Sequence, residues 1–235
     1  MGEGRELSSL ALPHNPKQST MVIDHNKLEP PAWAYVRMAR TRLFGRVYRR
    51  FAAELAGALA PGARVLDVGT GPGYLLAHLA RERPDLQLIG MDLSYRMIHG
   101  GREAAGLKIQ RLDHLVGDAQ ALPFPEGVFD QVAATFTFHT WKDRQAGVAE
   151  VWRVLKRGGQ AWIYELNREA PISDLRNYAR EEKLPFLLTY LGFKLTSLHH
   201  ALKAAAFAPV FREAGVTSWR LEKSHNLFWR AEIIK

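Results

Sequence analysis

Short apolar runs alternate with amphipathic helical stretches along the chain from Arg64 to about residue 166. This alternation is typical of βαβ units, in which helices cover a sheet of parallel strands. Right-handed crossovers place the carboxyl ends of such strands along one edge of the sheet, where a ligand binds. We therefore predict an α/β protein with a mostly parallel sheet and strands near residues 64–68, 87–92, 113–117, 130–136 and 160–166.

The sequence on either side of this region predicts further elements. A proline-rich arm leads into an amphipathic helix that ends near Pro61. If such an arm is ordered, it packs over the active site or against a second subunit, so a homodimer is an expectation. The predicted organisation is an arm and basic helix (1–60), a core (61–166), a helical insertion (167–205), and a closing helix with an antiparallel strand pair (206–235).

The segment VLDVGTGPG, residues 65–73, reads as a strand that runs directly into a glycine-rich turn. Glycines in such a turn let a ligand lie against the backbone, and a helix from about Tyr74 to Glu82 would point its N-terminal amides at that ligand. A dinucleotide fingerprint needs a third glycine where Tyr74 stands. The spacing therefore disfavours a nicotinamide cofactor.

Two further acids follow the next two predicted strands. Asp92 ends the apolar run LQLIGMD and lies 19 residues after Gly73, and Asp118 ends the strand in LVGDAQALPFP. An acid at the end of a second parallel strand can accept both hydroxyls of a ribose. Each acid alone could be a solvated loop carboxylate, but three acids in order at three consecutive strand ends, with Asp67 as the first, are hard to obtain by chance.

As a set, these segments resemble the class I S-adenosylmethionine (SAM) methyltransferases. The match extends to FDQVAATFTFHTWKD (129–143) and EVWRVLKRGGQAWIYEL (150–166), which resemble the methyltransferase 11 and menaquinone/ubiquinone C-methyltransferase group. Two positions depart from that group, Thr140 in place of a second histidine and Arg157 in place of proline. The resemblance covers roughly residues 62–166.

The resemblance implies a Rossmann-like fold with a mostly parallel, seven-stranded sheet, helices on both faces, and a helical cap over the acceptor site at 167–205. It also implies that SAM is the cofactor and S-adenosylhomocysteine the product. Asp67 would help to hold the amino acid end of SAM, Asp92 the ribose, Asp118 the adenine amino group, and the Ala119 amide a ring nitrogen. The full set of implied cofactor-binding residues is Asp67, Gly69, Thr70, Gly71, Gly73, Asp92, Leu93, Asp118, Ala119 and Thr135.

Methyl transfer from a sulfonium is an in-line displacement that needs alignment and exclusion of water more than side-chain chemistry. His139 is the candidate general base, because it lies just past the fourth strand and imidazole exchanges protons near neutral pH; a structural role is the alternative. His199 and His200 are interpreted as surface or pocket-rim residues. The expected acceptor pocket is lined by Tyr35, Phe138, Trp141, Tyr178 and Tyr190, and ordinary core packing is the competing interpretation for each aromatic residue.

Composition narrows these possibilities. The 235 residues are 47% hydrophobic and include no cysteine, which excludes disulfides, thiolate metal sites and cysteine nucleophiles. No metal is expected. No run approaches a membrane span, and the first twenty residues lack the apolar core of a secretory signal, so a cytoplasmic location is expected.

The net charge of +8 suggests a second hypothesis, that the protein binds a nucleic acid. Six arginines and no acid lie between Arg37 and Arg50, mostly on one face of the predicted helix. This face is either solvated or contacts phosphate or a membrane surface. Arg37 and Arg40 point toward the apolar side, and we hypothesise that one of them meets the SAM carboxylate or an anionic substrate. The leading expectation is methylation of a small apolar or aromatic molecule; the alternatives are RNA methylation and SAM binding without chemistry.

Overall fold

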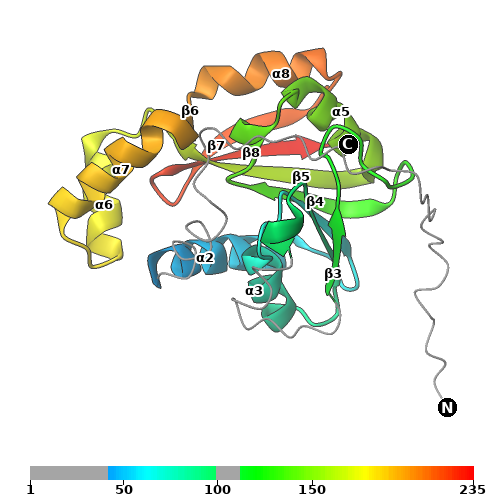
Figure 1. Cartoon of the computed structure of the whole chain (residues 1–235), viewed down its shortest axis with the longest axis horizontal. Helices are drawn as coiled ribbons and strands as arrows, with labels where there is room; N and C mark the ends of the chain where they lie inside the picture. The colour runs from blue at the N-terminus through cyan, green and yellow to red at the C-terminus, as the bar shows by residue number, and fades with distance from the viewer. Residues whose placement is uncertain (1–41, 99–111) are drawn as a thin grey trace. The chain divides into compact units, whose positions relative to one another are not determined.

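The computed structural model of the chain describes residues 42–98 and 112–235 (Figure 1). The predicted N-terminal arm lies outside these residues, as do Tyr35, Arg37 and Arg40. The first half of the described chain contains α2 (Arg42–Ala58), β1 (Arg64–Val68), α3 (Tyr74–Glu82), β2 (Gln87–Asp92), β3 (Leu112–Val116), β4 (Phe129–Thr135) and the 3₁₀ helix η2 (Phe138–Thr140). The second half contains α5 (Arg144–Val154), β5 (Leu155–Asn167), α6 (Ile172–Glu181), α7 (Phe186–His200), β6 (Ala201–Leu202), the 3₁₀ helix η3 (Ala204–Ala206), α8 (Phe207–Glu213), β7 (Trp219–Ser224) and β8 (Phe228–Ile234).

The strands form one sheet in the order β3-β2-β1-β4-β5-β8-β7. The pairs from β3 to β5 are parallel, whereas β8 is antiparallel to both β5 and β7. These seven strands confirm the predicted mostly parallel sheet, and the two-residue β6 adds a short parallel pairing to the end of β5. The order reverses between β1 and β4, so a ligand is expected beyond the carboxyl ends of these strands.

Hydrophobic side chains alternate across the sheet and give it two cores. Val65 and Leu88 face α2 and α3 on one side, whereas Leu66 and Val132 face α5 and α8 on the other. Figure 1 shows the corresponding helices on the two faces of the sheet. Because both faces are covered, strand β1 is buried along nearly its whole length, and Asp67 is the one acid in it.

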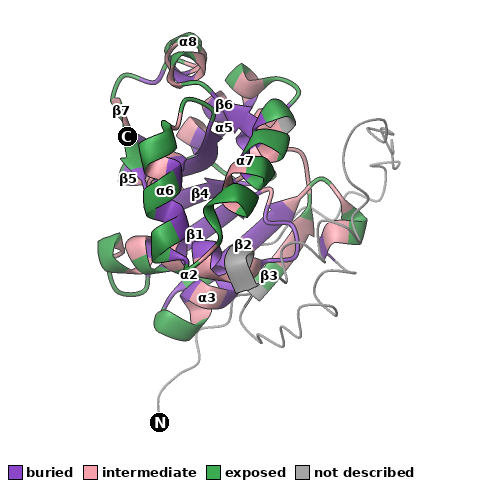
Figure 2. Cartoon of the chain, turned by 90° about the vertical axis from the view of Figure 1, so that its left-hand side faces the viewer, coloured by how far each residue is buried: buried purple, intermediate pink, exposed green. Residues whose placement is uncertain are grey.

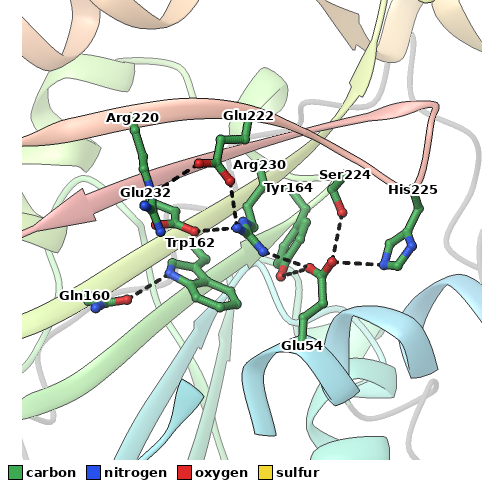
Figure 3. A network of polar contacts seen from close by, with 10 residues as sticks. All are labelled: Glu54, Gln160, Trp162, Tyr164, Arg220, Glu222, Ser224, His225, Arg230 and Glu232. Atoms are coloured by element: carbon green, nitrogen blue, oxygen red, sulfur yellow. Dashed lines mark hydrogen bonds and ion pairs between the residues drawn. The ribbon is translucent and has the colours of Figure 1, made fainter. Parts of the chain in front are cut away.

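Helix α2 is fixed to the sheet by stacking and by a polar network. The ring of Phe51 stacks on that of Tyr164 in β5, with 4.0 Å between ring centroids. The Glu54 carboxylate accepts a hydrogen bond from the Tyr164 hydroxyl at 2.8 Å and lies 3.1 Å from the Nε2 of His225 in the β7–β8 turn (Figure 3). Arg230 of β8 lies 3.4 Å from the same carboxylate and places its guanidinium 4.6 Å from the ring centre of Trp162.

This network shifts two pKa values in opposite directions. Burial favours neutral Glu54, but hydrogen bonds from His225 and Tyr164 outweigh it and lower the pKa of Glu54. Burial, followed by the negative charge of Glu54, raises the pKa of Tyr164. The network therefore holds a charged carboxylate against a neutral phenol, and it joins α2 to strands that lie more than 100 residues later.

The predicted strands agree closely with the structure except at β5. This strand begins at Leu155, directly after α5, rather than near residue 160. The glycine pair 158–159 allows the early start, because Gly158 adopts a positive φ of 77° and the pairing with β4 shifts register between Phe129 and Gln131. Among the described residues, no helix combines the length and apolar character needed to cross a bilayer.

Candidate cofactor and active site

The glycine turn after β1 is built as a tight loop against the end of β2. Gly69, Gly71 and Gly73 all have positive φ angles, of 74°, 54° and 85°. The amides of Gly69 and Thr70 both donate to the Met91 carbonyl, at 2.7 and 2.9 Å. A Cβ on Gly69 would lie 2.1 Å from the Thr137 hydroxyl oxygen. Glycine is therefore required there for both backbone conformation and space.

Asp67 lies beneath this turn with its side chain almost completely enclosed. Only 1% of the residue is exposed, and its Oδ2 accepts a 2.7 Å hydrogen bond from the Thr70 hydroxyl. Its Oδ1 is buried and has no hydrogen-bond partner within the described chain. Burial raises the pKa of Asp67 to about 7, the nearby Asp92 adds to the increase, and the Thr70 hydrogen bond opposes it. An unused buried acceptor of this kind fits an ammonium donor such as the α-amino group of SAM.

The other two acids end adjacent strands at the same edge. Asp92 accepts the Gly71 amide through Oδ2 and the Ser94 amide through Oδ1, both at 2.8 Å. Asp118 accepts the backbone and side-chain amides of Gln120, and the Gly117 amide donates to the Asp92 carbonyl at 3.0 Å. The sheet order therefore brings the ends of β1, β2 and β3 together, as the sequence predicts.

The remaining cofactor candidates occupy the same region in different environments. Leu93 is exposed over 56% of its surface, and Ala119 is half-buried. Thr135, at the end of β4, is buried, and its hydroxyl finds no partner among the described residues. These environments suit an apolar contact for Leu93 and an additional polar contact for Thr135, and their cofactor roles stay predictions.

His139 belongs to a chain of three polar side chains. Its backbone amide donates to Oε1 of Glu165 at 3.0 Å, and its Nδ1 lies 2.9 Å from Oε2 of the same carboxylate. Its Nε2 lies 3.1 Å from Nδ1 of His200, at the end of α7. Glu165 is completely buried in β5. The Arg144 guanidinium donates to the carbonyls of Phe138 and His139, which fixes the η2 turn.

This geometry assigns the protons along the chain. The Glu165 carboxylate already accepts the backbone amide of His139, and while it is ionised it can only accept from Nδ1 as well, which places a proton on that nitrogen. The Nε2 of neutral His139 is then the acceptor toward His200. If His139 acts as a base, Glu165 therefore fixes the orientation of its ring through Nδ1, and a proton from the side of α7 arrives through His200.

Sequence reasoning missed two members of this chain. Glu165 is a lone acid in the apolar strand sequence WIYEL, and that anomaly was the available signal, because a buried carboxylate needs a partner. His200, interpreted from the sequence as a surface or pocket-rim residue, is half-buried and lies 3.1 Å from Nε2 of His139, a contact that the sequence did not predict. The side chain of His199 lies outside the described parts of the structure.

Three of the predicted pocket residues are core residues instead. Phe138 has no exposed surface and stacks on Phe207 of α8 at 5.6 Å. Trp141 packs edge-on against Phe138 at 5.3 Å and covers Gly147 of α5. The η2 turn points both side chains into the core beside α5 and α8, so the assignment of these two residues to the pocket is corrected.

Tyr178 is likewise buried, at 4% exposure, and its ring meets Phe228 edge-on. Burial, then the charge of Glu182, raises the pKa of its hydroxyl. Its expected pocket role is therefore also corrected to a core role. Tyr190 is half-buried beside Phe186, and Lys194 lies over its ring at 5.7 Å; its pocket role stays a prediction.

Comparison with known proteins places the chain among methyltransferases. A family model described as a methyltransferase domain, of the methyltransferase 11 type, matches residues 66–163. The demethylmenaquinone methyltransferase of Roseiflexus castenholzii is 37% identical over 162 residues, which are 65% of this chain and 67% of that protein. The demethylmenaquinone methyltransferase of Deinococcus radiodurans is 39% identical over 120 residues, 51% of this chain and 49% of that protein.

The chain thus spans about half the length of several curated relatives that it matches. Among solved structures, a protein of Methanococcus maripaludis assigned as a SAM-dependent methyltransferase superposes with a TM-score of 0.67 at 23% identity, covering 87% of this chain and 91% of that one. At this identity the likeness concerns the fold alone.

Proposed function

The chain belongs to the class I SAM-dependent methyltransferases, and we propose that it transfers a methyl group from SAM to a small hydroxylated aromatic acceptor of the quinol type. The observation that carries the cofactor half of this proposal is the unused Oδ1 of Asp67 beneath the glycine turn. The acceptor half is supported by the relatives named as demethylmenaquinone methyltransferases and by the histidine chain at the same edge.

The residues at the strand ends divide the work of holding the cofactor. Asp67 would accept the α-amino group, and Asp92 the ribose hydroxyls once SAM is bound. Asp118 and the Ala119 amide would take the adenine edge, with Leu93 against its face. SAM supplies an activated methyl group on a positively charged sulfur. The chain's own contribution is to fix this group against the acceptor and exclude water.

The histidine chain would manage the proton that the acceptor loses. A hydroxylated aromatic ring becomes a stronger nucleophile, at its oxygen or at the adjacent ring carbon, when its hydroxyl gives its proton to a positioned imidazole. If the methyl joins the ring carbon, that carbon then loses its own hydrogen as a proton and the ring becomes aromatic again. Glu165 fixes the tautomer of His139 and stabilises the imidazolium that forms. Because His200 occupies Nε2 of His139, the proton enters either through His200 or after α7 shifts away from His139. We place His139 as the base, Glu165 as a positioning residue and His200 as the link to the cap.

Ion pairs made by the arginines of α2 weaken the alternative hypothesis of RNA methylation. Arg46 and Arg50 belong to the basic face, but Arg46 contacts Glu182 at 3.1 Å and Arg50 contacts both Glu181 and Glu182. Part of that face therefore docks on the end of α6 instead of facing a phosphate backbone. A homodimer and the expected cytoplasmic location stay predictions.

The test is a methylation assay with SAM labelled on its methyl group and a panel of quinols, phenols and amines. The proposal predicts a product from a hydroxylated aromatic acceptor that carries the labelled methyl, together with one equivalent of S-adenosylhomocysteine. If SAM binds and no acceptor is methylated, the chain is a SAM-binding protein without this chemistry. Salt-sensitive methylation of RNA would favour the nucleic-acid reading instead.

A further inference from the structure

Helix α7 points five leucines away from the body of the protein. Their exposed fractions lie between 54% and 73%: Leu187, Leu188, Leu191, Leu195 and Leu198. At 3.6 residues per turn these side chains fall within roughly 100° of one another around the helix axis. On the opposite side, Phe193 and Ser197 are buried against the core. In Figure 2 much of the α7 ribbon has the green colour of exposed residues.

The five exposed leucines gather on one stripe of a single helix, the leucine face. Single exposed leucines are ordinary, but contiguous apolar patches of several hundred Å² mark interaction surfaces. Helix α7 contains no acidic residue, and Lys194 is its one lysine or arginine. The leucine face is therefore apolar and nearly uncharged along the helix itself.

Around the leucine face, the acidic side chains have cationic partners, whereas several basic side chains have no acidic partner among the described residues. The neighbouring carboxylates are engaged: Glu181 by Arg50, Asp174 by Lys223, and Glu182 by Arg46 and Arg50. Four cations surround α7, and in the described part of the chain none of them pairs with a carboxylate: Arg176, Lys183, Lys194 and Lys203. Arg176 lies over the Phe186 ring at the start of the helix, 5.4 Å from its centre.

An apolar face with a cationic border matches an anionic lipid surface. Leucines of an interfacial helix enter the boundary between headgroups and acyl chains, while lysines and arginines meet the phosphates. A second copy of the chain fits less well. Antiparallel pairing about the middle of α7 would match the leucines but bring Lys183 of one copy toward the end that carries Lys203 in the other, where the nearby Glu169 carboxylate already accepts the Ala204 amide.

We propose that the leucine face of α7, with its border of cations, docks on a bilayer that contains anionic phospholipid. This is peripheral contact, with α7 lying in the plane of the headgroups. If the proposed function holds, the contact also places the His200 end of the cap beside the phase in which an apolar acceptor dissolves. The surface contact itself does not depend on that function.

The experiment is flotation of the full chain with vesicles of phosphatidylcholine, with and without phosphatidylglycerol. We expect binding to the anionic vesicles that weakens as salt is added. The variant Leu191→Ser/Leu195→Ser should bind at least ten-fold more weakly, since each leucine gives up apolar burial. The matched control Tyr95→Ser/Val116→Ser removes two equally exposed apolar side chains elsewhere and should bind as the unchanged protein does.

Charge is tested separately. The variant Lys183→Gln/Lys194→Gln/Lys203→Gln should lose roughly a hundred-fold in binding to anionic vesicles, whereas Lys142→Gln/Arg157→Gln, at exposed sites away from α7, should lose much less. Circular dichroism and thermal unfolding check that each variant is folded.

Because the chain has no cysteine, a single Leu191→Cys carries an environment-sensitive dye at a defined place. Its emission should shift to the blue on anionic vesicles, and a dye at Arg157→Cys should not respond. Absence of vesicle binding overturns the proposal. So does a concentration-dependent dimer that the leucine variant abolishes while vesicles have no effect, since a second copy would then be the occupant.

Discussion

Glu165 holds His139 at two points, accepting the backbone amide through Oε1 at 3.0 Å and facing Nδ1 through Oε2 at 2.9 Å. The carboxylate therefore fixes both the position of the η2 turn and the tautomer of the imidazole. Glutamine in its place must offer an amide N–H to one of two groups that are themselves donors. The substitution keeps the volume and removes the alignment.

We expect Glu165→Gln to lower kcat roughly 100-fold, the usual contribution of a positioned base, with little change in the affinity for S-adenosylhomocysteine. Steady-state kinetics and calorimetry on the same preparation measure the two effects. Glu213→Gln, an exposed acid outside the site, is the control. Retention of full kcat by the glutamine variant would show that Glu165 does not position the base.

A readout that needs no acceptor accompanies this test. Long-range proton–nitrogen spectra report which ring nitrogen carries the proton, and we expect Nδ1 for His139 in the unchanged protein. A neutral His139 protonated on Nε2 would contradict the hydrogen-bond chain. In the glutamine variant the preference for Nδ1 should be reduced, a change that loss of packing alone does not produce.

The affinity for SAM should depend on pH through Asp67. Its raised pKa, about 7, means that the carboxyl is protonated below neutrality, and the positively charged ligand favours the ionised form. Binding is therefore strong above pH 7 and weakens as the pH falls, toward ten-fold per pH unit. Calorimetry between pH 5.5 and 8 measures this slope. Asp67→Asn should bind weakly and without the slope, and a slope that survives in the variant would assign it to another group.

The close contact between Gly69 and Thr137 predicts that alanine destabilises the protein more at Gly69 than at a glycine with open space around it. Gly69 and Gly62 have similar positive φ angles, 74° and 71°, but a Cβ on Gly62 meets nothing within 4 Å. Gly62→Ala should cost about 1 kcal/mol of stability from backbone strain alone. Gly69→Ala should cost several times as much in urea unfolding, and Thr137→Gly in the same chain should restore part of the loss. Equal losses of stability at the two sites would show that the Thr137 side chain moves away from the new Cβ at no cost, and would contradict the prediction.

The Glu54 network predicts a pH-dependent contribution to stability. Because its hydrogen bonds lower the pKa of Glu54, the stabilisation is fully present above the ordinary value of 4.5 and is lost as the pH falls through the lowered one. Glu54→Gln should therefore lose about 1–2 kcal/mol at pH 7 and converge with the unchanged protein in acid. The more exposed Glu222→Gln should lose less. A loss from Glu54→Gln that persists unchanged at low pH would contradict this assignment.

The parts of the fold that the sequence predicts are those governed by local signals. The strand ends carrying Asp67, Asp92 and Asp118 follow from short apolar runs and a glycine turn, each contained within a few residues. Local sequence does not predict the start of β5, because Leu155 begins the strand by pairing with Phe129, which lies 26 residues earlier.

Contacts that are distant in sequence account for the other errors. Nothing near Arg46 or Arg50 signals that their partners are Glu181 and Glu182, more than 130 residues later. Phe138 and Trp141 flank the expected mouth of the site, but the direction of their side chains is set by the rings of α8 and by Gly147. His200 meets His139 only because α7 returns to the sheet edge before β6.

Calorimetric titration of S-adenosylhomocysteine tests the cofactor site most directly, using the unchanged protein, Asp92→Ala, and Asp113→Ala as an exposed control acid on the neighbouring strand. We expect micromolar binding by the unchanged protein and by Asp113→Ala, and loss of binding by Asp92→Ala. Absence of binding by the unchanged protein, or equal binding by all three, would mean that the strand ends of β1 and β2 do not form the cofactor site.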